Sequence, residues 1–263
     1  MVRHFEISAG SVTIAGKVFG QDLSKTAPCI ILCHEFGLSI RSTTRYALRL
    51  CQRGYQVLVF DFPGSGAGRS RGRSSTEASV LTEVADLQTV FEYACTQPFV
   101  DKSHIVLAGA SQGGLVAALL AARHASQIEK LVLYYPALNI PDDARRGNML
   151  GTHIDPNRIP DTFRVMGYVR LGRRYVTDAQ ALDPWKEIGK YAGPVLICHG
   201  ADDKIVDISY ARRAAAEYPD ATLVELPGAG HLFAAPWTVD RAVDVTFGFL
   251  SGDTSPATRP ARS

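Results

Sequence analysis

Short apolar runs alternate with segments of helical periodicity along most of this chain, and this alternation constrains the fold more than any other feature. The runs are apolar over nearly their whole length, as strands buried on both faces of a sheet are. They span residues 28–34, 56–62, 104–110, 130–136 and 194–200, and the helical segments span residues 41–53, 78–96, 112–125, 208–218 and 239–250. The alternation predicts an α/β fold with a mostly parallel central sheet flanked by helices.

The first two predicted strands, residues 2–8 and 11–19, have a different pattern. They alternate polar with apolar residues and are joined by Ala9 and Gly10. This pattern is typical of an antiparallel hairpin with one wetter face. We therefore expect the hairpin to form one edge of the sheet.

One connection is much longer than a usual crossover between parallel strands. Residues 137–190, between the sixth and seventh strands, mix Pro, Gly and aromatic residues and contain one clear helical segment at 173–182. Because long ordered insertions are commonly functional, we expect a lid, with a purely structural extension as the alternative. The predicted organisation is a core of residues 1–136 and 191–250, a lid of 137–190 and a flexible C-terminal tail of 251–263.

The charges are nearly balanced, with 28 Lys and Arg against 26 Asp and Glu. This balance argues against a nucleic acid or an anionic membrane as a partner. The one basic run, Arg69, Arg71 and Arg73, lies among Gly and Ser and is expected to be a solvated loop. Neither a signal peptide nor a long apolar span is recognised, so the expected location is cytoplasmic.

The five cysteines are widely spaced and form no zinc-binding pattern, so we expect reduced thiols and no metal site. Neither a phosphate-binding loop nor a dinucleotide fingerprint is present. We therefore expect no cofactor.

The strongest functional signal is G-x-S-x-G, formed by Gly109, Ser111 and Gly113. It directly follows a predicted strand and precedes a predicted helix, as a nucleophile elbow does. Small residues on both sides allow the backbone to approach closely. Ser111 is therefore the candidate nucleophile.

A serine nucleophile needs a base and a carboxylate that orients the base, in the chain order Ser, Asp/Glu, His. Asp203 and His231 follow two later strands in this order and are the predicted acid and base. The alternative is that Asp202 is the acid and Asp203 caps the next helix. His199 is expected to brace the turn.

The tetrahedral intermediate of acyl transfer needs two hydrogen-bond donors for its oxyanion. The backbone N–H of Gln112, after the nucleophile, and that of Phe36, in the loop after an earlier strand, are the candidates. His34 in the same loop is expected to be a buried structural residue.

These motifs together resemble the α/β-hydrolase superfamily and, more narrowly, its feruloyl (cinnamoyl) esterase-like group. The resemblance covers residues 28–250 and rests on D-F-P-G-S-G-A-G-R-S (61–70), G-A-S-Q-G-G (109–114), D-P-N-R-I-P-D (155–161), H-G-A-D-D-K-I-V (199–206) and G-A-G-H-L-F (228–233). It implies an α/β-hydrolase fold and a cofactor-free serine esterase with Ser111, Asp203 and His231 as its triad. It also implies a lid that binds an aromatic acyl group, with Asp143 and Tyr175 contacting the phenolic ring. The alternatives for these two residues are a solvated turn carboxylate and a packed lid aromatic.

Three positions depart from the esterase pattern. Glu35 stands where the group usually has glycine, and an ionised carboxylate pointing at an oxyanion hole would oppose its charge. Glu35 must therefore turn away, be protonated or have a role, such as substrate binding. Ala110 replaces a common histidine, and Pro63 replaces an arginine before a lengthened turn at 64–68.

The sequence thus predicts hydrolysis of an aromatic or other small carboxylic ester through an acyl-enzyme. One alternative is a hydrolase similar to dienelactone hydrolases, which resemble this chain in carrying a glutamate at a place comparable to Glu35. Another is a ligand-binding protein that kept the fold and lost the chemistry. The expected partner is a small-molecule ester, and a homodimer stays open beside a monomer.

Overall fold

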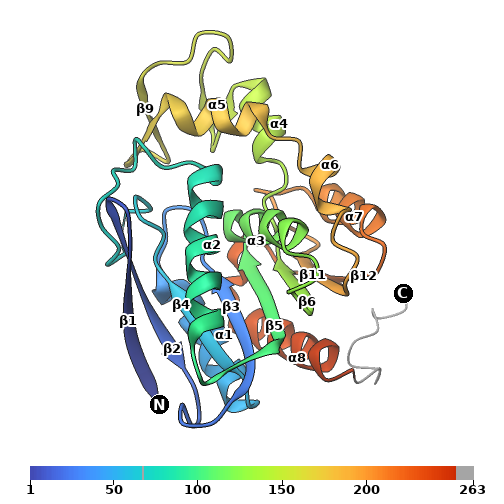
Figure 1. The fold of residues 1–263 in the computed structure, drawn as a ribbon. Coiled ribbons are helices and arrows are strands. Elements are labelled where there is room, and N and C mark those ends of the chain that lie inside the picture. The colour runs from blue at the N-terminus through green and yellow to red at the C-terminus, as the bar shows by residue number, and fades with distance from the viewer. Residues whose placement is uncertain (67, 253–263) are drawn as a thin grey trace.

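The computed structural model describes residues 1–66 and 68–252. Its centre is an eight-stranded sheet with the strand order β1-β2-β4-β3-β5-β6-β11-β12 (Figure 1). The strands are β1 (Val2–Ala9), β2 (Val12–Phe19), β3 (Ala27–Cys33), β4 (Gln56–Phe60), β5 (Val100–Ala110), β6 (Lys130–Tyr134), β11 (Val195–Gly200) and β12 (Ala221–Leu226). The β1–β2 and β2–β4 pairs are antiparallel and the other pairs are parallel. Both the mostly parallel sheet and the hairpin at its edge are confirmed.

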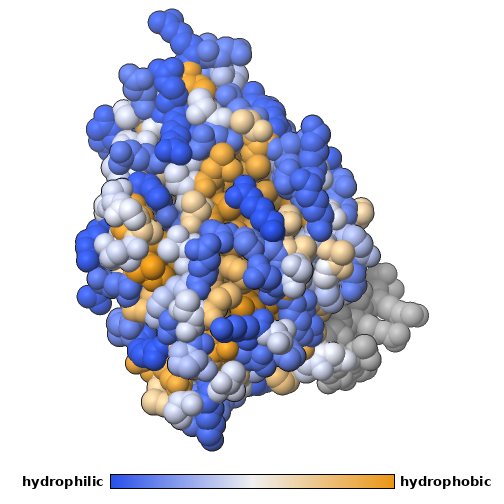
Figure 2. Space-filling view, in the orientation of Figure 1, coloured by the Kyte–Doolittle hydropathy of each residue, from blue (hydrophilic) through white to orange (hydrophobic). Residues whose placement is uncertain are grey.

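Helices cover both faces of this sheet (Figure 1). One face carries α1 (Ile40–Gln52) and α8 (Pro236–Ser251), and the other carries α2 (Val80–Thr96), α3 (Gln112–Arg123) and α7 (Ile208–Glu217). In β3, Ile31 belongs to one apolar cluster and Leu32 to the other, because successive strand side chains point to opposite faces. The face in view in Figure 2 is largely hydrophilic, with hydrophobic residues visible mainly in its hollows.

Residues 137–190 form a separate layer at the end of the sheet where β5 and β6 end (Figure 1). The elements are α4 (Ile140–Arg146), β7 (Asn148–Met149), β8 (Thr152–His153), β9 (Thr162–Val165), β10 (Val169–Gly172), α5 (Arg173–Ala181) and α6 (Pro184–Ile188). The predicted helix at 173–182 is confirmed as α5. Two small hairpins, β7–β8 and β9–β10, were not expected, because strands of two to four residues are too short to show a periodicity.

Two predicted features lie partly beyond the described residues. Ser251 belongs to α8, and residues 253–263 of the predicted tail lie outside the described part of the chain. Ala67 of the predicted turn at 64–68 does so as well. Within residues 1–66 and 68–252, no helix combines the length and the hydropathy that spanning a bilayer requires.

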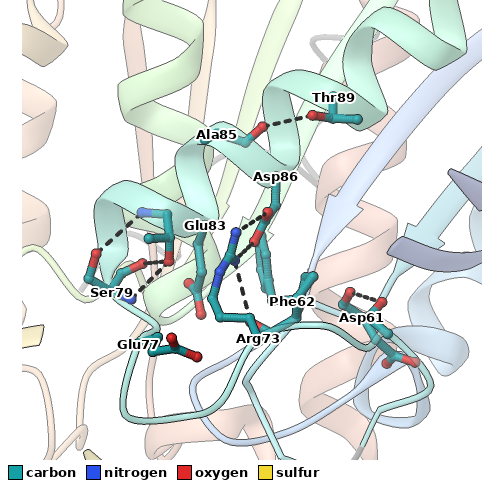
Figure 3. Close-up of polar contacts among 12 residues, drawn as sticks. Asp61, Phe62, Arg73, Glu77, Ser79, Glu83, Ala85, Asp86 and Thr89 are labelled. Carbon is teal, nitrogen blue, oxygen red and sulfur yellow. Dashed lines mark hydrogen bonds and ion pairs between the residues drawn. The ribbon is translucent and has the colours of Figure 1, made fainter. Parts of the chain in front are cut away.

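The basic run is a solvated loop only in part. Arg69 and Arg71 are exposed, but the side chain of Arg73 is only 15% exposed. It forms a two-pronged ion pair with the buried carboxylate of Asp86 on α2, at 2.5 and 3.0 Å (Figure 3). The prediction is therefore wrong for Arg73. The Gly and Ser residues around it do not reveal that a buried carboxylate elsewhere in the chain needs a charged partner.

Candidate active site

Ser111 lies on the turn between β5 and α3, with φ 53° and ψ −121°. This is a strained backbone conformation for a residue with a side chain. It depends on the glycines on either side. A Cβ on Gly109 would lie 2.1 Å from the carbonyl oxygen of Gly113, and a Cβ on Gly113 would lie 2.4 Å from that of His34. The close approach that the sequence predicts for these glycines is confirmed.

The structure brings Ser111, His231 and Asp203 together. Nε2 of His231 lies 2.9 Å from the hydroxyl oxygen of Ser111, and Nδ1 lies 2.7 Å from Oδ2 of Asp203. With Nδ1–H donating to the carboxylate, Nε2 is the ring nitrogen that accepts the serine proton. The three residues come from the ends of β5, β11 and β12, which meet at one edge of the sheet.

Asp203, and not Asp202, is the carboxylate that contacts the histidine. The other oxygen of Asp203, Oδ1, accepts hydrogen bonds from the backbone N–H groups of Ile205 (2.8 Å) and Val206 (2.9 Å). Asp202 is exposed, and the N-cap of α7 is Asp207. The alternative in which Asp202 points into the site is therefore not the one observed.

His199 supports the same carboxylate from the core side. Its Nε2 lies 2.9 Å from the carbonyl oxygen of Val206 and 3.3 Å from Oδ2 of Asp203, which confirms its bracing position. Burial by itself would raise the pKa of Asp203, but the hydrogen bonds from His199 and His231 outweigh it and hold that pKa well below its usual range. The carboxylate therefore stays ionised beside His231.

The two expected oxyanion donors, Phe36 and Gln112, both line the pocket that contains Ser111. Gln112 is the first residue of α3, so its N–H has no acceptor within the helix. In the part of the chain that the structure describes, neither backbone N–H makes a hydrogen bond. His34 is structural, as expected, since Nδ1 lies 2.7 Å from the carbonyl oxygen of Glu35 and Nε2 accepts from the N–H of Phe62 (3.1 Å).

Residues 137–190 supply most of the wall of this pocket. Besides Phe36, Ser111 and Gln112, the lining consists of Ala137, Asn139, Ile140, Asp143, Met149, Leu150, Tyr175, Ile205 and Val206. Asp143 is held by Asn139 (2.6 Å) and Arg146 (2.6 Å). Tyr175 is buried, packs edge to face on Phe36 and donates its hydroxyl to Oε1 of Gln112 (2.5 Å). Both expected acyl-contact residues therefore lie in the pocket wall.

Glu35 turns away from the pocket. Its Oε1 accepts from the hydroxyl of Tyr135 (2.9 Å) and its Oε2 from that of Ser42 (2.5 Å), and it does not line the pocket. The expectation that Glu35 binds substrate is therefore wrong, because two buried hydroxyls already satisfy its carboxylate. Sequence reasoning missed Tyr135, whose ring packs edge to face on His231. Its place just after β6, at the strand end where ligand sites form, was the available signal.

The fold and the site together define a class of protein. A mostly parallel sheet, a serine on a strained strand-to-helix turn, and an aspartate and a histidine after later strands form the arrangement of α/β hydrolases. Across the described residues, His, Cys, Asp and Glu side chains nowhere gather in a group of three that could hold a metal ion. The chain is an α/β hydrolase of the serine type.

A family model described as "Serine aminopeptidase, S33" matches residues 24–165, and the chain belongs to this family of hydrolases. A structure of Est1E from Butyrivibrio proteoclasticus with bound ferulic acid is 27% identical, with a TM-score of 0.87 over 95% of this chain and 98% of that one. A second structure of Est1E is 25% identical, with a TM-score of 0.82 over 94% and 99% of the chains. The resemblance to the feruloyl esterase-like group is thereby confirmed.

A curated relative is more distant. The human acylamino-acid-releasing enzyme is 27% identical over 164 residues, which are 60% of this chain and 21% of that enzyme. The chain therefore spans about a fifth of the length of this relative.

Proposed function

We propose that this hydrolase is a carboxylic ester hydrolase that cleaves small esters with an aromatic acyl group of the hydroxycinnamoyl type. The observation that carries the proposal is the pair of hydrogen bonds made by His231, at 2.9 Å to Ser111 and 2.7 Å to Asp203. These bonds connect a nucleophile, a base and an orienting carboxylate in the way that acyl transfer through a serine requires.

In the proposed mechanism, His231 takes the hydroxyl proton of Ser111 as its oxygen attacks the ester carbonyl. The backbone N–H groups of Phe36 and Gln112 stabilise the resulting oxyanion. His231 then gives the proton to the leaving alcohol, and the acyl group stays on Ser111. Water, deprotonated by His231, releases the acid. Asp203 holds the tautomer of the imidazole throughout and stabilises its protonated form.

The composition of the pocket wall supports an aromatic acyl group that ends in a hydrogen-bond donor. Ile140, Met149 and Leu150 supply apolar surface. Asp143 supplies carboxylate oxygens, and within the described chain the buried Oδ1 of Asn139 has no hydrogen-bond partner. Acceptors beside an apolar wall suit a phenolic hydroxyl. The ferulic acid bound to Est1E carries such a group, which supports the same class of ligand for this chain.

Residues 137–190 act as the lid in this proposal. The pocket has a volume of about 30 Å³, which is room for about two water molecules. An aromatic ring therefore enters only if part of the wall moves. We propose that the turn of the β7–β8 hairpin is the part that moves, because Leu150 on this turn borders the pocket.

The test is a hydrolysis panel with Ser111→Ala as the control. Methyl hydroxycinnamates are compared with p-nitrophenyl acetate, a dienelactone and N-acylaminoacyl amides. Preference for the hydroxycinnamates, lost in Ser111→Ala, supports the proposal. Preference for the amides would favour a peptidase, the activity named in the family description and in the human relative, and preference for the lactone would favour the dienelactone alternative.

A second experiment separates an enzyme from a ligand-binding protein that retains only the fold. A fluorophosphonate probe reacts covalently with an activated serine. We expect it to label the wild type and not Ser111→Ala. Failure to label the folded wild type would contradict an acyl-transfer function.

The homodimer and the cytoplasmic location stay predictions.

A further inference from the structure

Three buried side chains form one hydrogen-bonded chain that runs from the acyl pocket into the core. Tyr175 in the pocket wall donates to Oε1 of Gln112 (2.5 Å), and Nε2 of Gln112 donates to Oε2 of Glu83 (2.7 Å). We propose that Glu83 is a specificity-determining residue whose protonation state sets, through Gln112, whether Tyr175 accepts or donates a hydrogen bond in the pocket. The inference rests on the proposed function, because it concerns the same acyl pocket.

The direction of the hydrogen bonds between these side chains follows from the donors and acceptors that each group has. An ionised carboxylate has only acceptors, so Gln112 must turn its NH₂ group toward Glu83. The carbonyl oxygen of Gln112 then faces Tyr175 and takes its hydroxyl proton. The tyrosine oxygen has only lone pairs left for the pocket. In this state the pocket accepts a hydrogen bond from a ligand, and the bonds from Tyr175 to Gln112 and from Gln112 to Glu83 have this direction in the structure.

A proton on Oε2 of Glu83, the oxygen that faces Gln112, reverses every bond between these three side chains. The carboxyl O–H donates to the carbonyl oxygen of Gln112, whose amide group turns by half a rotation about its last bond. The NH₂ group of Gln112 then donates to the oxygen of Tyr175. The hydroxyl proton of Tyr175 is now free to point into the pocket. The chain has gained one proton and no bond between heavy atoms has changed.

Burial makes the coupling between these groups strict. Glu83 is 5% exposed, Gln112 1% and Tyr175 2%. A buried donor or acceptor left without a partner costs free energy that water would otherwise offset. The three groups therefore change direction together, since any one of them turning alone would put two donors or two acceptors face to face.

Among the titratable side chains of this cluster, Glu83 is the one that changes its protonation state near neutral pH. Asp86 follows it by one turn of α2 and is paired with Arg73, which reaches in from the preceding loop (Figure 3). Cys33 at the end of β3 and Tyr175 on α5 also face it, and burial raises the pKa of both groups well above its usual value.

Glu83 itself has a pKa of about 8. Burial raises it, the hydrogen bond from Gln112 lowers it, and the charges of Asp86 and Arg73 act in opposite directions. The direction of the hydrogen bonds from Tyr175 to Glu83 therefore reverses within a pH range in which the enzyme can be assayed.

The test compares two substrates that differ only at the far end of the ring. The methyl ester of para-aminocinnamic acid offers a donor and that of para-methoxycinnamic acid an acceptor. Neither ring substituent ionises between about pH 6 and about pH 10. The ratio of their kcat/KM values cancels every pH effect on the chemical step that the two substrates share. In the wild type, we expect the amino-to-methoxy ratio to rise about 5- to 10-fold through pH 8, as one hydrogen bond reverses.

Two variants decide the result. Glu83→Gln cannot ionise, so its ratio is expected to be independent of pH. Glu92→Gln, an exposed glutamate on the same helix, is the matched control and should follow the wild type. A flat ratio in the wild type, or an unchanged rise in Glu83→Gln, would overturn the inference. Melting temperatures confirm that each variant is folded.

A second measurement keeps this test separate from the proposed function. If p-nitrophenyl acetate is cleaved and neither cinnamate is, the proposed acyl class of the substrate is wrong. The hydrogen bonds between Tyr175, Gln112 and Glu83 can still be examined. Nitrogen-edited NMR reports the side-chain amide of Gln112, assigned by its loss in Gln112→Met. We expect its resonances to shift with a midpoint near pH 8 in the wild type and not in Glu83→Gln. No shift in the wild type would refute the coupling.

Discussion

Tyr135 donates its hydroxyl proton to Glu35 across 2.9 Å, while the edge of its ring lies against His231 with 4.9 Å between the ring centroids. Tyr135 is fully buried and adopts φ 38°, a conformation that is uncommon for a residue with a bulky side chain. The carboxylate that departs from the esterase pattern is therefore part of the support behind His231. It does not line the pocket that contains Ser111.

This relationship predicts a mild effect of Glu35→Gln on catalysis. The amide oxygen can still accept from Tyr135, so we expect kcat/KM for a p-nitrophenyl ester to fall by less than about tenfold. Loss of a general acid or base typically costs about 10² to 10⁴, and a loss of that size would contradict a supporting position. Tyr135→Phe keeps the ring against His231 and removes one donor to the buried carboxylate, so its main effect should be a destabilisation of about 1–3 kcal/mol, measured by urea unfolding.

The two neighbouring aspartates are expected to differ sharply. Asp203→Asn replaces the carboxylate that orients His231, and kcat should fall by about 10⁴. Asp202→Asn changes an exposed residue and should leave kcat within about twofold of the wild type. Steady-state kinetics on one ester decides between them. Equal losses in both variants would show that the orienting carboxylate is not assigned correctly.

Glu83 should make stability fall as the pH rises. Burial raises its pKa from 4.5 to about 8, so between these values the folded protein holds a proton that the unfolded chain has lost. The stabilisation is complete below the unfolded pKa and is lost as the pH rises through the folded pKa, by up to about 5 kcal/mol. Urea unfolding of the wild type and Glu83→Gln from about pH 5 to about pH 9 should show a much flatter dependence in the variant. Parallel curves would contradict the shift.

Arg73 should be important for stability although it lies in a Gly- and Ser-rich loop. Arg73→Met leaves the carboxylate of Asp86 buried and without its cation, at an expected cost of about 2–4 kcal/mol. Adding Asp86→Leu should restore much of this loss. Arg71→Met breaks an exposed pair with Glu6, which solvent screens, and should have a much smaller effect. Equal effects of the two single variants on the free energy of unfolding would argue against the ion pair.

Leu150 should limit the size of the acyl group, because it borders a pocket too small for an aromatic ring. We expect Leu150→Ala to raise the ratio of kcat/KM for p-nitrophenyl benzoate to that for p-nitrophenyl acetate by about tenfold. Met166→Ala, in the exposed turn of the β9–β10 hairpin, is the control and should leave the ratio unchanged. A ratio that does not respond to Leu150→Ala would place the acyl group elsewhere.

The sequence was sufficient to predict the parallel sheet, its antiparallel edge and the residues that meet at the strand ends. Ser111, Asp203 and His231 each follow a strand that the apolar pattern reveals. The carboxyl ends of parallel strands lie at one edge of a sheet, so the order of the strands brings these residues together. Their local neighbours, such as the glycines beside Ser111, are also adjacent in the chain and are therefore visible as a motif.

Only the tertiary structure decided where Glu35, Arg73 and Glu83 point. Glu35 meets Tyr135, a hundred residues away, and Arg73 meets Asp86 on the following helix. Glu83 meets Tyr175 through Gln112. No periodicity records these partners, because each pairing depends on which loops and helices pack over the charged group. A charged side chain alone has the same sequence signature in a solvated loop and in a buried network. Packing decides between them, since it removes the water and makes a hydrogen-bonding partner necessary.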